Sequence, residues 1–124
     1  MLLNSIHHVA IIFSNYEVSK EFYLKLGFRI KRENRRAKDW KLDLELDNCE
    51  LEIFGPDSNP PSRVTMPEAC GLRHLAFRVE SVEETVRELA ALGIECEPIR
   101  YDDLCGGHFT FFKDPDGLPL ELHE

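Results

Sequence analysis

The fold is decided by a stretch that the chain carries twice: IHHVAII at residues 6–12 and LRHLAFR at residues 72–78. His8 and His74 are 66 positions apart in these stretches. The same offset separates LGF at residues 26–28 from LGI at residues 92–94. Because several matches recur in the same order, the sequence indicates an internal repeat.

Each copy predicts the element order βαβββ. The first strands are expected at residues 6–13 and 72–79, where β-branched and aromatic residues cluster. Helices are expected after the capping residues Ser14-Asn15 in the first copy and Ser81 in the second, and Gly27 and Gly93 are placed to end them. The later strands are expected to include alternating residues 40–47, then residues 51–54, 95–100, 107–112 and 118–122. The sequence DPDG at residues 114–117 predicts a tight turn.

The chain of 124 residues fits one domain built from two repeats. We expect the repeats at about residues 4–55 and 71–124, with a linker at residues 56–70 that is rich in proline, serine and asparagine.

Four residues at repeated places point to a metal. Strand alternation puts His8 and His74 on equivalent faces, and each copy closes with a glutamate in an apolar run, Glu52 and Glu121. A glutamate inside an apolar strand is costly to bury unless a positive charge pairs with it. Imidazole and carboxylate ligands suit one divalent ion per site, Ni²⁺, Co²⁺, Zn²⁺, Mn²⁺ or Fe²⁺. Glu50 shares the face of Glu52 and rivals it as the second ligand.

The remaining histidines fit this pattern less well. His7 is expected on the opposite strand face from His8, and it has no histidine counterpart in the second copy. His108 and His123 have no counterparts in the first copy and are interpreted as surface or pocket-lining residues.

Composition narrows the partners. The net charge is −8, from 15 basic and 23 acidic residues, which disfavours nucleic acid and anionic membranes. No signal peptide or membrane-spanning run is visible, so a cytoplasmic location is expected. The four cysteines are widely spaced and are expected to be free thiols.

The chain resembles the vicinal oxygen chelate superfamily, and within it small bacterial proteins similar to glyoxalase I (lactoylglutathione lyase). The resemblance covers nearly the full length. It rests on both histidine strands, on Leu26-Gly27-Phe28, on the glutamate runs at residues 51–54 and 120–122, and on FFKDPDG at residues 111–117.

The resemblance implies an α+β fold in which tandem βαβββ modules form curved mixed sheets around a metal site. It assigns the metal ligands to His8, Glu52, His74 and Glu121. It also implies that the metal stabilises an enolate while Glu121, with Glu52 as its partner, transfers a proton of an α-oxo-aldehyde adduct. A small-molecule substrate and a homodimer are expected by the same analogy, with metal ligands from one chain or from two.

Two departures bear on the substrate. Glutathione-dependent members usually carry arginine four residues after the first ligand and asparagine four residues after the second, where this chain has Ile12 and Pro56. The alternatives are therefore a metal-dependent thiol transferase like the fosfomycin-resistance proteins and a metal-free antibiotic-binding protein like the bleomycin-resistance proteins.

Overall fold

The computed structural model of the chain describes residues 2–124, and it divides into two compact units, unit 1 (Met1–Ser62) and unit 2 (Arg63–Glu124). Unit 1 contains β1 (Val9–Ile12), α1 (Tyr16–Lys25), β2 (Arg29–Arg35), β3 (Asp39–Leu46) and β4 (Cys49–Pro56). Unit 2 contains β5 (Leu75–Arg78), α2 (Val82–Ala91), β6 (Arg100–Tyr101), β7 (His108–Lys113) and β8 (Pro119–His123). Within residues 2–124, neither helix has the length and apolar character that crossing a membrane requires.

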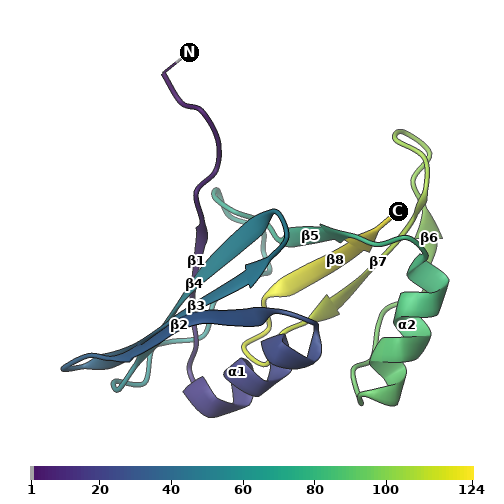
Figure 1. Ribbon diagram of the computed structural model, residues 1–124. Helices are drawn as coiled ribbons and strands as arrows, with labels where there is room; N and C mark the ends of the chain where they lie inside the picture. The colour runs from purple at the N-terminus through teal and green to yellow at the C-terminus, as the bar shows by residue number, and fades with distance from the viewer. Residues whose placement is uncertain (1) are drawn as a thin grey trace. The chain divides into compact units, whose positions relative to one another are not determined.

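Both units form a four-stranded mixed sheet with the same topology. The strand order is β1-β4-β3-β2 in unit 1 and β5-β8-β7-β6 in unit 2 (Figure 1). The first and last strands of each unit pair in parallel, and the other neighbours pair antiparallel. The predicted α+β fold with two βαβββ modules is therefore confirmed.

The helix boundaries follow the capping residues. The Asn15 side chain accepts a hydrogen bond from the Val18 amide at 3.2 Å, and the Ser81 hydroxyl accepts one from the Glu84 amide at 3.2 Å. These bonds satisfy amides that a helix leaves without an internal partner. After each helix the chain turns at a glycine with positive φ, 105° at Gly27 and 81° at Gly93.

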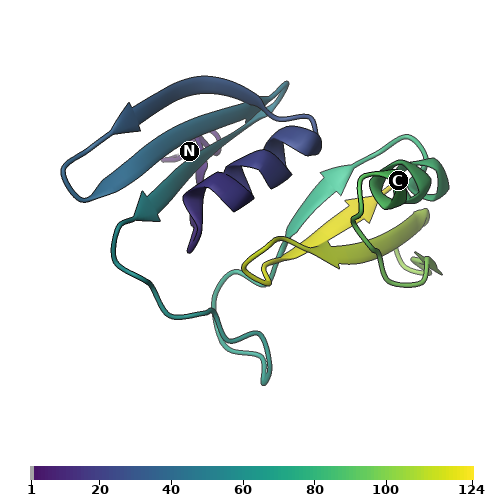
Figure 2. The ribbon, with the colours of Figure 1, turned by 90° about the horizontal axis from the view of Figure 1, so that it is seen from below.

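Helix α1 covers one face of the sheet in unit 1, as Figure 2 shows. Its Tyr23 is fully buried and stacks on Phe13, with ring centroids 5.3 Å apart. The sheet contributes buried leucine and isoleucine side chains to the same core: Leu42, Leu44, Leu51 and Ile53. Because side chains alternate along strands, the neighbours of these core residues in β4, Glu50 and Glu52, lie on the other face of the sheet.

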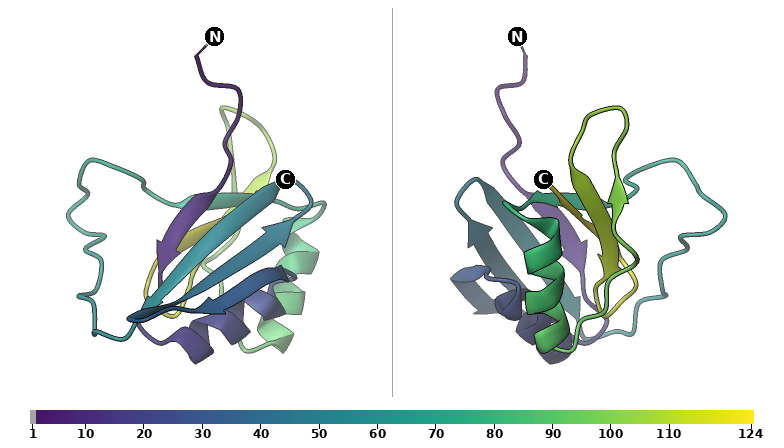
Figure 3. Two further views of the ribbon diagram at one scale, coloured as in Figure 1. Left: turned by 60° about the vertical axis from the view of Figure 1, so that its left-hand side comes forward. Right: turned by 90° about the vertical axis from the view of Figure 1, so that its right-hand side faces the viewer.

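Unit 2 repeats this division. Helix α2 runs alongside its sheet (Figure 3, right) and buries Val82 and Leu89. The sheet buries alternate residues of β7 and β8: Thr110, Phe112, Leu120 and Leu122. Phe111 and Glu121, which pair across these strands, belong to the opposite face.

The prediction of a strand at residues 95–100 is wrong for most of its length, since only Arg100–Tyr101 pairs with β7. The segment still follows β7: the Glu97 amide donates to the Phe111 carbonyl at 2.9 Å, and the Thr110 hydroxyl donates to the Glu97 carbonyl at 2.7 Å. Pro98 has no amide hydrogen, so a regular ladder cannot continue through it.

Candidate metal centre

Unit 1 brings His8 and Glu52 together. Ala10 of β1 lies opposite Glu52 of β4, and His8 precedes Ala10 by two residues, on the approach to the strand. His8 Nδ1 lies 3.1 Å from Glu52 Oε2. The predicted rival, Glu50, instead accepts a hydrogen bond from Lys31.

Unit 2 brings His74 and Glu121 together in the same way. Ala76 of β5 lies opposite Glu121 of β8, so the register matches that of unit 1. His74 Nε2 lies 2.9 Å from Glu121 Oε1. The Glu121 side chain is 12% exposed, compared with 21% for Glu52. Each predicted histidine thus meets its predicted glutamate within its own unit.

His7 lies beside His8 and not on the opposite face, where strand alternation predicted it. His7 and His8 precede β1, so strand alternation does not govern their side chains. The two Nδ1 atoms lie 2.9 Å apart, and ligand atoms of His7, His8 and Glu52 all lie within 4.8 Å of one another. Ligand atoms bound to one cation at about 2.1 Å are typically about 3–3.5 Å apart. The short separations and the imidazole and carboxylate donors of this cluster therefore fit a transition metal.

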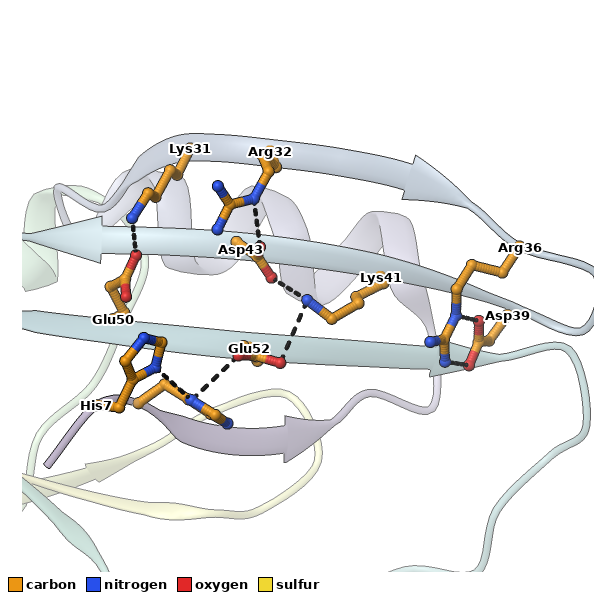
Figure 4. Close-up of polar contacts among 10 residues, drawn as sticks. His7, Lys31, Arg32, Arg36, Asp39, Lys41, Asp43, Glu50 and Glu52 are labelled. Atoms are coloured by element: carbon orange, nitrogen blue, oxygen red, sulfur yellow. Dashed lines mark hydrogen bonds and ion pairs between the residues drawn. The ribbon is translucent and has the colours of Figure 1, made fainter.

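Glu52 belongs to a series of ion pairs that connects it through Lys41 and Asp43 to Arg32, as Figure 4 shows. Lys41 Nζ lies 3.2 Å from Glu52 Oε1 and 2.7 Å from Asp43 Oδ1. Arg32 Nε donates to the other Asp43 oxygen at 2.9 Å. Lys41 thus binds one carboxylate oxygen of Glu52, Oε1, and the other oxygen, Oε2, faces His8.

These contacts explain why Asp43 is ionised although it is only 4% exposed. Burial alone would raise the pKa of Asp43, but the hydrogen bonds from Lys41 and Arg32 outweigh it, and the pKa lies below its usual value. The hydrogen bond to Asp43 likewise raises the pKa of Lys41. Asp43 and Lys41 are therefore both ionised at neutral pH. The alternation of β3 predicted Asp43 on the polar face but did not identify its partners.

The surroundings of Glu121 are different. Its cross-strand neighbour in β7 is Phe111, whose ring meets the His74 ring edge to face at 5.0 Å between centroids. Among residues 2–124, no lysine or arginine forms an ion pair with Glu121. The two glutamates therefore occupy equivalent register positions with different neighbours, one ionic and one aromatic.

Comparison with known proteins identifies the family. The chain is 57% identical to uncharacterized protein YwkD of Bacillus subtilis (strain 168), over 100% of this chain and 99% of that protein. It is also 57% identical to a glyoxalase family protein from Enterococcus faecalis, whose crystal structure matches with a TM-score of 0.91 over 100% of both chains.

A more distant structure shares the fold. It is the E126Q mutant of the fosfomycin resistance protein FosX from Listeria monocytogenes, in complex with Mn(II) and 1S,2S-dihydroxypropylphosphonic acid. FosX is 20% identical, with a TM-score of 0.75 over 98% of this chain and 90% of that chain. Residues 5–122 match the family model, and the chain belongs to the Glyoxalase/Bleomycin resistance protein/Dioxygenase superfamily.

Proposed function

We propose that the protein is a metal-dependent lyase or isomerase of the glyoxalase I type, acting on a small α-oxo-aldehyde adduct. His8, Glu52, His74 and Glu121 hold one divalent ion per site, and Glu121 and Glu52 carry protons. The two units thus act as one functional domain, with ligands from one chain or from two copies in a homodimer.

The repeated histidine–glutamate contact carries this proposal. Contacts of 3.1 Å and 2.9 Å occur at the same register of two parallel strand pairs, each beside an alanine. A structural accident would have to occur twice at matching positions. In unit 1, His7 adds a second imidazole, and so a third ligand group, beside the pair and is the alternative ligand there.

The neighbours of the two glutamates favour different roles. Lys41 holds one oxygen of Glu52, which favours ligation through the other oxygen and makes Glu52 the secondary proton carrier. Glu121 faces His74 and an aromatic ring and is held by no lysine or arginine among residues 2–124. We therefore assign to Glu121 the removal of a proton from the carbon beside the substrate carbonyl and its return to the adjacent carbon.

The bound cation would supply a Lewis acid for neighbouring substrate oxygens, where negative charge develops. His8 and His74 would offer it imidazole nitrogens, and Glu52 and Glu121 would offer it carboxylate oxygens. Ile12 and Pro56 replace the arginine and asparagine that usually bind glutathione, so the thiol from which the adduct is formed is not specified. The assay therefore compares adducts of several thiols.

Metal binding tests the ligand set. Metal-free protein is titrated with Mn²⁺, the ion in the FosX complex, and with Ni²⁺ and Zn²⁺, by calorimetry and elemental analysis. We expect about one ion per site, and His74→Ala should weaken binding at least about 100-fold, since it removes a direct ligand. His108→Ala is the matched control, because its histidine also contacts a glutamate, Glu124, at 3.2 Å. Equal occupancy in the two variants would refute the assignment of His74.

Proton transfer tests the chemistry. Methylglyoxal adducts of glutathione and of other thiols are incubated with the loaded protein in D₂O and followed by NMR. We expect Glu121→Gln to lower turnover by at least about 100-fold while metal is retained, because general-base catalysis contributes about 10²–10⁴-fold and the amide of glutamine cannot accept the proton. Glu50→Gln, which changes a carboxylate paired with Lys31, serves as the control. If no adduct reacts with any metal, the glyoxalase I activity is excluded.

A further inference from the structure

A cavity of about 620 Å³ opens within unit 2 beside the His74–Glu121 pair. Both residues line it, together with Phe109 and Phe111 of β7. Three arginines also line the cavity: Arg63, Arg73 and Arg100. They are three of the six lysines and arginines of residues 63–124, a segment that also carries 13 acidic residues. Positive charge is therefore concentrated at this cavity within an otherwise acidic unit.

Two of the three arginines keep hydrogen-bonding capacity. Arg73 is neutralised by Glu68, with nitrogens 2.6 Å and 2.7 Å from one carboxylate oxygen. Arg63 donates to the Leu72 carbonyl at 3.0 Å, and among residues 2–124 it pairs with no carboxylate. A guanidinium has five N–H donors, so Arg63 retains most of them.

Arg100 is held by aromatic rings. Its guanidinium carbon lies 5.0 Å from the Phe109 ring centroid and 5.5 Å from the Phe111 centroid. Its hydrogen bond to Glu97 is long, 3.3 Å, and both side chains are about half exposed, so this pair is weak. Stacking on rings fixes the plane of a guanidinium while its N–H groups remain able to bind an anion in a bidentate manner.

Strand register places this cation next to the proposed reacting residues. Arg100 pairs with Phe109, and Phe111 pairs with Glu121, so the four share the face of the sheet away from α2. The Phe111 ring contacts both His74 and Arg100. A small molecule that reaches His74 and Glu121 therefore has an arginine beside it within the same cavity.

We propose that Arg100, assisted by Arg63, forms an oxyanion subsite of this cavity, so that the substrate carries a carboxylate or a phosphonate or phosphate group. This specifies the substrate class of the proposed function: an anionic α-oxo compound is preferred to a neutral one. Planar bidentate contact suits both kinds of oxyanion. Arg100 acts here in binding and takes no part in proton transfer.

The test measures binding to the full chain without metal, so that its outcome is separate from that of the lyase proposal. Pyruvate, methylphosphonate and the neutral butane-2,3-dione are titrated by ¹H–¹⁵N NMR. We expect an anion to shift the amides of Arg100, Phe109 and Phe111, and butane-2,3-dione to bind at least about tenfold more weakly. Pyruvate alone indicates a carboxylate subsite, methylphosphonate alone a phosphonate or phosphate subsite, and both a general oxyanion subsite; each supports the proposal.

Variants separate binding from folding. Arg100→Gln should raise the Kd of the bound anion at least about tenfold, Arg63→Gln should raise it less, and Arg100→Lys should restore part of the affinity. Arg87→Gln is the control, because Arg87 lies on α2 and pairs with Glu83 at the surface. Equal Kd values for Arg100→Gln and Arg87→Gln, equal affinity for pyruvate and butane-2,3-dione, or no binding of either anion would overturn the proposal.

Discussion

Replacement of Asp43 by asparagine measures what the buried charge network contributes to the fold. The Asp43 side chain is 6% exposed and accepts hydrogen bonds from Lys41 at 2.7 Å and Arg32 at 2.9 Å. Hydrogen bonds to charged groups stabilise by about 1.5–3 kcal/mol and neutral ones by about 0.5–1.5 kcal/mol. Lys41 and Arg32 bind different oxygens of Asp43, and asparagine has only one acceptor oxygen. It can therefore keep a weakened contact with one cation and loses the other, an average loss of about 1 kcal/mol per contact.

The two contacts do not count equally. The Arg32 side chain is 59% exposed, so water screens its contact and reduces the loss there by about half. We therefore expect Asp43→Asn to lower the free energy of unfolding by about 1.5 kcal/mol at pH 7. For a chain of this length that corresponds to a decrease in Tm of about 6 °C. Urea denaturation followed by circular dichroism gives the first quantity and a thermal scan the second.

The pH dependence gives a second signature. The folded pKa of Asp43 is lowered, so its charge contributes stability that is present above the unfolded pKa and is lost as pH falls through the folded value. The difference between wild type and Asp43→Asn should therefore stay constant from pH 7 to about pH 5 and shrink below about pH 4. Asp47→Asn is the control, since Asp47 is 98% exposed and lies 3.3 Å from Arg29. Equal losses in both variants, or a difference that persists unchanged to pH 3, would refute this reasoning.

Two further substitutions test the local packing. A Cβ at Gly55 would lie 2.7 Å from Tyr16 Cδ1 and 3.1 Å from Tyr16 Cβ. Gly55→Ala should therefore lower the free energy of unfolding, measured by urea denaturation, by about 1–3 kcal/mol. An unchanged free energy of unfolding would contradict this close packing. Ser81→Ala removes the acceptor for the Glu84 amide and should cost about 1 kcal/mol, whereas Ser58→Ala, after β4 on an exposed segment, should cost little. A loss in Ser81→Ala no larger than that in Ser58→Ala would contradict the capping role.

The sequence predicts the fold well because its main signals are local. Residues that cap or end helices act within one turn, so Asn15, Ser81, Gly27 and Gly93 are found where the sequence predicts them. The repeat then determines that both units share one topology. Strand periodicity fails where the backbone is irregular, as at residues 95–99.

The candidate site is predictable only in part. The repeat predicts that each histidine lies near its glutamate, and the structure pairs them within each unit, although His8 and His74 both precede their strands. The position of His7 could not be predicted, because it has no histidine counterpart in the second copy and alternation does not extend to residues before β1. Lys41 and Asp43 appear in the sequence as ordinary polar residues of an alternating strand; their role depends on the cross-strand register that places Asp43 opposite Glu52.

That register also explains why two equivalent glutamates differ. Asp43 opposite Glu52 would place two carboxylates side by side, which is unfavourable unless a cation lies between them. Lys41 supplies that cation and holds one oxygen of Glu52, leaving the other 3.1 Å from His8. In unit 2 the same register position carries Phe111, which needs no compensating charge and leaves Glu121 without a lysine or arginine partner among residues 2–124. The duplicated fold thus repeats the histidine–glutamate pair, while the residues of the neighbouring strand differ, so that Glu52 is ion-paired and Glu121 faces an aromatic ring.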